Sequence, residues 1–162
     1  MNIFFLDNDP KLAAIYACDK HCVKMILESA QMLSTSHSLY PKNIIPLESD
    51  FSIYKPSFKN HPCTLWVCKS KSNYQWLAEY AYELCKEYTY RYEKTHKSES
   101  LIKWFNENIP EIDDLGFTFP ALAMPEEYHT DDHVKSYRLY YVLNKKVNIQ
   151  CTWKKRNPPE WF

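Results

Sequence analysis

The chain alternates between segments with helical hydrophobic spacing and proline-containing segments without it. The clearest helical pattern runs from Asp19 to His37, where the apolar residues recur at helical spacing and no proline or glycine interrupts them: Cys22, Val23, Ile26, Ala30 and Leu33. A second pattern begins at Pro62 and continues to about Tyr92, with a break near residues 70–72. Its predicted buried stripe consists of Tyr74, Leu77, Ala78, Ala81, Leu84, Cys85, Tyr88 and Tyr92. The two patterns predict the two main helices.

Capping signals predict shorter helices. Asp9 is followed by Pro10, the typical order of an N-cap and a first helical residue. Thr130 precedes two aspartates, which suit a helix N-terminus because of its positive dipole end. The shorter helices are therefore expected over residues 10–18, 100–106 and 131–146.

The intervening segments, residues 38–60 and 107–129, contain prolines and are expected to be long loops. Residues 2–6 are expected to be extended or partly buried, and strand signals are scarce elsewhere. At 162 residues the chain has the length of one domain. We therefore expect an all-α fold, a compact bundle of about five helices with two long proline-containing loops, forming a single domain over residues 1–162.

Composition narrows the possible functions. The 20 basic and 20 acidic residues cancel, which argues against binding nucleic acid by overall charge but allows a local basic patch. With Gly116 as the single glycine, P-loop and Rossmann sites are excluded, since both need several glycines. The first residues lack the basic region of a signal peptide, and no segment has the length of a membrane span. We expect a cytoplasmic protein with no membrane association.

The helix predicted from Asp19 carries the first candidate site. Lys20, Lys24 and Glu28 follow at steps of four residues, and His21 lies two turns before Glu28 on the same side. A carboxylate, two ammonium groups and an imidazole on one surface suit acid–base chemistry beside an anion. An ordinary surface ion pair between Lys24 and Glu28 explains the same spacing.

The second candidate site is Asn60-His61-Pro62 at the start of the next long helix, with Trp66 one turn later. A helix N-terminus presents free N–H groups and attracts anions such as phosphate. His61 or Asn60 acting as a helix cap is the simpler interpretation, and both interpretations can hold together.

Metal sites are the weaker interpretation of the cysteines and histidines. The groups Cys18-His21-Cys22 and His61-Cys63-Cys68 lack clean zinc spacing, and in a reducing compartment their thiols suit buried positions. His129 and His133 flank two aspartates that helix capping explains. His37 and His96 fall at predicted helix ends, where they would be solvated or would offset the helix dipole. We expect no metal and no cofactor.

The C-terminus holds the one concentrated basic and aromatic stretch, with Lys154, Lys155 and Arg156 between Trp153 and Trp161. Such a stretch suits a nucleic-acid backbone with a base stacked on an indole. A tail that packs its aromatic rings on the core and leaves its cations in solvent is the alternative.

The order of these motifs resembles a known family. The run from Asp19-Lys20-His21 to Glu28 is similar to the helix of the phage pyrimidine-dimer DNA glycosylases of the endonuclease V type. Asn60-His61-Pro62 with Trp66, Leu84-Cys85-Lys86-Glu87-Tyr88 and Tyr90-Arg91-Tyr92 resemble motifs of bacterial relatives. The resemblance covers roughly residues 1 to 93.

The resemblance implies a DNA glycosylase, with possible AP-lyase activity, that acts on a damaged or modified pyrimidine. In that family the chain's own α-amino group attacks C1′ to give a Schiff base, and the helix glutamate handles protons. An α-amine suits this task because its usual pKa is near 8. The carry-over assigns catalysis to Glu28 and the amine of Met1 or Asn2, places His21 beside the substrate, and gives DNA or a nucleotide as the ligand. The predicted ligand-binding residues are Lys20, Lys24, Asn60, His61, Trp66, Arg91, Lys154, Lys155 and Arg156.

Three departures from the family keep alternatives open. Asn2 is a poor residue for methionine removal, the net charge is zero, and there are only three arginines, Arg91, Arg138 and Arg156. A non-catalytic nucleotide- or oligonucleotide-binding protein on the same scaffold, such as a virus-encoded accessory factor, is therefore the second hypothesis. A helical protein whose aromatic residues meet a partner chain is the third, and the oligomeric state stays open.

Overall fold

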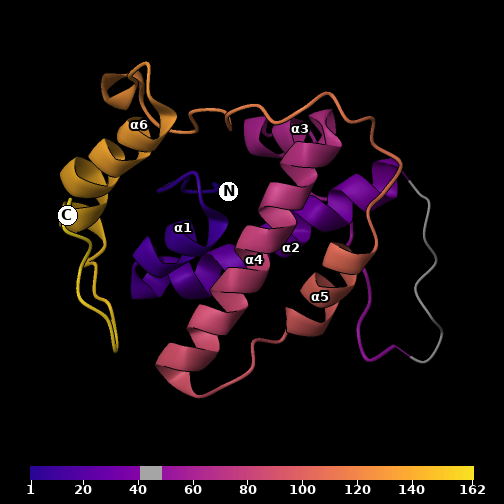
Figure 1. Ribbon diagram of the computed structural model, residues 1–162, viewed down its shortest axis with the longest axis horizontal. Coiled ribbons are helices and arrows are strands. Elements are labelled where there is room, and N and C mark those ends of the chain that lie inside the picture. Colours follow the sequence, from indigo (N-terminus) through magenta and orange to yellow (C-terminus); the bar gives the residue numbers. More distant parts are fainter. Residues whose placement is uncertain (41–48) are drawn as a thin grey trace.

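A computed structural model describes residues 1–40 and 49–162 and shows helices joined by loops, with no strand in those two stretches (Figure 1). The all-α prediction is therefore confirmed. The helices are α1 (Pro10–Tyr16), α2 (Asp19–Leu39), α3 (Pro62–Lys69), α4 (Lys71–Tyr92), α5 (Glu99–Glu107) and α6 (His133–Tyr140). A 3-10 turn, η1 (Glu126–Tyr128), precedes α6, and a π-helical turn, η2 (Tyr141–Lys145), joins it to the short α7 (Lys146–Asn148).

Helix α4 forms the centre of the structure and contacts α1, α2, α3 and α5. Its predicted stripe is buried at Tyr74, Leu77, Ala78, Ala81, Leu84 and Cys85, while Tyr88 and Tyr92 are half-buried. The stripe predicted for α2 is buried as well, except at Val23, which is 39% exposed. The 3.6-residue period thus identified the faces that form the core.

Local signals set several helix boundaries. Asp9 caps α1 by accepting hydrogen bonds from the backbone N–H groups of Lys11 and Leu12, with Pro10 at the first position. The break predicted near residues 70–72 is present at Ser70, whose extended backbone separates α3 from α4. Of the loop predicted over residues 38–60, residues 41–48 lie outside the described residues, and the first two residues, 38 and 39, belong to α2.

Other predicted boundaries are wrong as well. Helix α1 ends at Tyr16 rather than Cys18, because Ala17 turns extended and Cys18 becomes the N-cap of α2. Helix α6 is capped by Asp132, which accepts from the Lys135 N–H, rather than by Thr130. The hydroxyl of Thr130 instead accepts from the Asp132 N–H, so it shapes the turn before the helix.

The chain ends are tied to the central helices. Residues Ile3, Phe5 and Leu6 are fully buried, so the N-terminal segment enters the core and brings Met1 toward α2 and α3. Near the other end, Trp153 is 7% exposed and its indole donates to the Tyr16 carbonyl. In the parts described, no helix is both long enough and apolar enough to cross a membrane.

Candidate active site at the N-terminal amine

Asn2 folds the N-terminal segment back toward α2. Its side-chain oxygen accepts hydrogen bonds from the N–H groups of Ile3 and Phe4, and its amide donates to the Ala123 carbonyl at 2.8 Å. Phe4 adopts a left-handed backbone with φ of 55°, and its ring stacks on His21 at 4.0 Å between centroids. A non-glycine residue in this conformation persists only where its surroundings hold it, as they do here.

The segment delivers the terminal amine to the glutamate of α2. The Met1 nitrogen lies 3.9 Å from Oε2 of Glu28, and the Asn2 N–H donates to the same oxygen at 2.9 Å. Lys24 approaches the other carboxylate oxygen at 3.4 Å, and its side chain is 66% exposed. The side chain of Met1 is 1% exposed and accepts a hydrogen bond from the Thr64 hydroxyl at its sulfur. An amine, a carboxylate and an accessible cation therefore share one site.

His61 borders this site at the N-terminus of α3. Its Nδ1 accepts from the Cys63 N–H at 3.2 Å, so the neutral ring carries its proton on Nε2. Partial burial and the positive N-terminal amine lower the pKa of His61, while the carboxylate of Glu28 acts in the opposite direction. The ring is thus close enough to feel both charges. His61 is therefore the cap of α3, and its role as a contact for an anion such as phosphate stays a prediction.

His21 lies on the same face of α2 as Glu28, and its ring contacts other side chains on several sides. Burial lowers its pKa to about 3, and the positive charges of Lys145 and Lys24 contribute. Its Nδ1 forms a short hydrogen bond with the phenol of Tyr141. Sequence reasoning missed Tyr141 and Lys145 because 120 positions separate Tyr141 from His21.

Several residues predicted to bind nucleic acid do not join the site. Arg91 has no exposed surface and bonds to Glu87, Asp19 and two backbone carbonyls, so its guanidinium is committed within the protein. Trp66 is 5% exposed and its indole donates to the Thr118 carbonyl, which leaves no ring face for a base. Lys20 and Asn60 are exposed on the surface.

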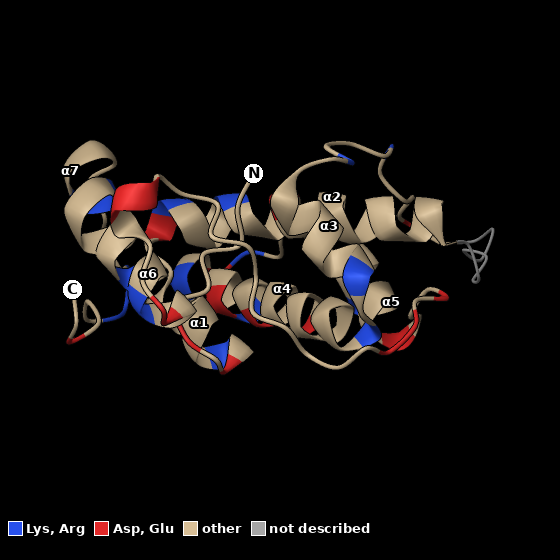
Figure 2. Cartoon of the chain, turned by 90° about the horizontal axis from the view of Figure 1, so that it is seen from above, with Lys and Arg blue, Asp and Glu red and all other residues tan. Residues whose placement is uncertain are grey.

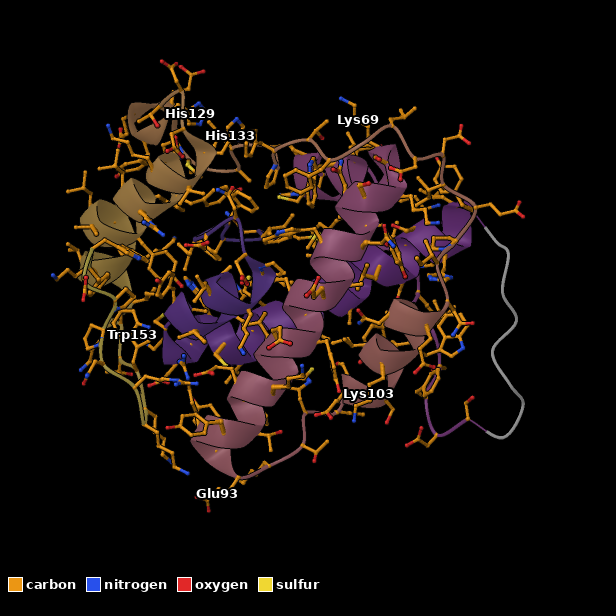
Figure 3. All side chains as sticks on the ribbon, viewed as in Figure 1. Lys69, Glu93, Lys103, His129, His133 and Trp153 are labelled. Atoms are coloured by element: carbon orange, nitrogen blue, oxygen red, sulfur yellow. The ribbon has the colours of Figure 1, made fainter. Side chains whose placement is uncertain are left out.

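The basic residues of the C-terminus are paired with the protein itself. Arg156 forms two hydrogen bonds to Glu87, and Lys155 bonds to Glu93 at the end of α4. The Lys154 N–H donates to Asp19, and its ammonium lies over the ring of Tyr92. Figure 3 shows Trp153 on the C-terminal segment and Glu93 at the end of α4. Trp153 thus packs on the core as the alternative expected, but the cations pair with carboxylates and rings of the protein rather than standing free in solvent.

No metal site is evident in the described residues, where no group of three or more metal-binding side chains is close enough to hold an ion. All six cysteines are free thiols. His129 and His133, which lie near each other in Figure 3, contact the carbonyls of Met124 and Pro120 respectively. His37 is buried rather than solvated, with 4% of its surface exposed, and hydrogen-bonds to the hydroxyl of Tyr74.

A comparison with protein families gives this arrangement a context. The sequence model of the family described as pyrimidine dimer DNA glycosylase matches residues 1–100, which include the N-terminal segment, Glu28 and His61. The chain belongs to this family of DNA glycosylases. No curated protein and no solved structure matches it.

Proposed function

We propose that the protein is a DNA glycosylase that removes a damaged or modified pyrimidine by attack of its N-terminal amine. The observation that carries the proposal is the 3.9 Å approach of the Met1 nitrogen to Glu28 in a site with an accessible lysine. Family membership supports the reaction class and the DNA ligand.

The reaction needs a nucleophile and a proton carrier. The amine nitrogen forms a bond to C1′, and the base leaves with the electron pair of the glycosidic bond. The amine gives up protons as the sugar ring opens, its O4′ takes a proton, and an imine joins the protein to C1′. Glu28 is the group that accepts and returns these protons, because its Oε2 lies beside the nitrogen. Elimination of the 3′ phosphate from this imine would provide AP-lyase activity.

Met1 is the residue to which we assign the amine. Its side chain is buried and anchored by Thr64, while the backbone N–H of Asn2 is already committed to Glu28. Removal of Met1 would empty this anchor and expose a new amine at Asn2. Intact-mass measurement identifies the first residue directly.

The surroundings suit a nucleic-acid backbone at this point. Lys24 and Lys20 are exposed on the same helix, and His61 at the N-terminus of α3 is near enough for the charge of the amine to lower the pKa of its ring. Figure 2 shows basic and acidic residues interspersed over the helices rather than separated onto two faces. We therefore expect phosphate contacts confined to the site and salt-sensitive binding of modest strength. A DNA substrate implies a cytoplasmic location, that of the host if the protein is virus-encoded.

Borohydride trapping tests the proposal. Labelled duplexes with a cyclobutane pyrimidine dimer, an abasic site or no lesion are reduced with the protein, and the adduct is located by peptide mass. We expect an adduct on residue 1 that is lost on acetylation of the amine and in Glu28→Gln, but kept in the control Glu83→Gln on the outer part of α4. Absence of an adduct with every lesion would reject the proposal. Nucleotide binding that survives Glu28→Gln would then favour the non-catalytic alternative.

A further inference from the structure

The hydroxyl of Tyr141 is the polar group that meets His21 inside the protein. Tyr141 is fully buried at the start of the π-helical turn η2, outside the family-matched residues 1–100. Its ring meets that of Phe4 in the N-terminal segment edge-on, with 5.4 Å between centroids. Single π turns recur at functional sites because they shift one side chain relative to the helix.

The contacts of the Tyr141 hydroxyl indicate which group receives its proton. The phenol oxygen accepts from the Cys18 N–H at 3.4 Å, and its single proton has two possible acceptors, Nδ1 of His21 and Sγ of Cys18. The sulfur is a weak acceptor at 3.8 Å, whereas the contact with Nδ1 is short. The short contact favours donation of the phenol proton to Nδ1, and such donation requires an unprotonated Nδ1.

The remaining contacts hold the ring in place. Phe4 covers one face of His21, and the Phe4 N–H in turn donates to the side-chain oxygen of Asn2. Lys24 on α2 and Lys145 on η2 are the cations near the ring. Lys24 also contacts Glu28, so the imidazole and the carboxylate flank one lysine on the same helix face.

We propose that Tyr141 is a positioning residue that fixes His21 as a neutral imidazole with its proton on Nε2, a hydrogen-bond donor for the DNA that reaches the amine. The inference rests on the proposed function for its role in the reaction. The tautomer itself follows from the contacts of Tyr141.

Imidazole ¹⁵N spectroscopy of the full chain tests the tautomer without any substrate. The signals of His21 are identified by their loss in His21→Gln. We expect an unprotonated Nδ1 at neutral pH in the unaltered protein and a mixture of tautomers in Tyr141→Phe, with Tyr140→Phe as the control. A protonated Nδ1, or the same spectrum in Tyr141→Phe, would overturn the assignment.

Trapping rates test the role in the reaction. We expect Tyr141→Phe to slow adduct formation about three- to tenfold, the size of one lost neutral hydrogen bond. The same substitution should have no further effect in a His21→Ala background, and melting curves verify that each variant is folded. An unchanged rate in Tyr141→Phe would reject the role. If no lesion gives an adduct with any variant, the proposed function and this role fail together, whereas the spectra still decide the tautomer.

Discussion

Two clusters of opposite charges lie along α2, and they differ in how fully their hydrogen bonds are used. Around Arg91 the guanidinium bonds to Glu87, Asp19 and the carbonyls of Ile15 and Ala17. Burial raises the pKa of Glu87, but hydrogen bonds from Arg156 and Arg91 outweigh it and lower the pKa below its usual value. Every charged side chain of this cluster is hydrogen-bonded to another group of the protein.

The cluster around Glu28 is arranged differently. The distances from its oxygens to the Met1 nitrogen and to Lys24 are 3.9 and 3.4 Å, and one full hydrogen bond, from the Asn2 N–H, holds the carboxylate. The amine and the lysine remain available to another molecule. The Arg91 cluster therefore holds α1, α2, α4 and the C-terminal segment together, whereas the Glu28 cluster keeps groups free for acid–base chemistry.

The substitution Glu28→Gln is expected to separate these roles most sharply. It removes the proton acceptor but leaves an oxygen for the Asn2 N–H, so adduct formation should fall by about 10²- to 10⁴-fold with little change in the free energy of unfolding. Trapping kinetics and denaturant titration measure the two effects. A large loss of stability with unchanged trapping would show that Glu28 belongs with the structural cluster.

Arg91→Met is expected to do the reverse. Leaving the carboxylates of Glu87 and Asp19 without their buried partner should lower the free energy of unfolding by about 3–5 kcal/mol. The control is Lys86→Met on the same helix, whose exposed ion pair with Glu83 contributes less than about 1 kcal/mol. Urea titration compares the two variants, and equal losses would contradict the assigned role of Arg91.

Acid should destabilise the fold through two buried histidines that lie on α2. Burial lowers the pKa of His21 to about 3 and that of His37 to about 4. Because the unfolded chain protonates these rings near pH 6.5 and the folded chain does not, stability falls as the pH drops below that value. Each contributes a loss of about 2 kcal/mol between pH 7 and pH 5.

Melting temperatures across this pH range measure the loss, and His37→Phe supplies the control. This variant keeps an aromatic ring against Phe105 and Trp104 but removes one titrating group. Its stability should therefore depend less steeply on pH. An unchanged slope would show that His37 does not titrate on unfolding.

The sequence predicted the helices and part of the site for local reasons. Hydrophobic period and capping are properties of neighbouring residues, and they located α2, α4 and the caps at Asp9 and His61. Likewise, His21, Lys24 and Glu28 lie on one face of α2 because they are spaced three and four residues apart along it. That the terminal amine lies beside Glu28 agrees with what the family resemblance implied, and spacing within the chain does not predict it.

What the sequence did not predict depends on contacts between distant segments. Arg91 looked available as a phosphate ligand, but the fold buries it against the end of α1. Tyr141 had no local signal connecting it to His21. The positive charge of a side chain is visible in the sequence, whereas its partner is decided by packing.

The smallest expected effect distinguishes Lys24 from a lysine in an equivalent structural pair. Lys24 and Lys103 each pair with a glutamate four residues away on the same helix, and both lysine side chains are at least half exposed. Replacing either with Gln should change stability by less than about 0.5 kcal/mol, because solvent screens such pairs.

Lys24→Gln should in addition weaken binding to lesion-containing DNA and reduce the slope of log K against log salt by about one. Figure 3 places Lys103 on α5, away from the N-terminal segment, so Lys103→Gln should leave the slope unchanged. Fluorescence anisotropy at several salt concentrations compares the two. Equal slopes would show that DNA does not contact Lys24, and the site would then have to recruit its phosphate through Lys20 or the N-terminus of α3.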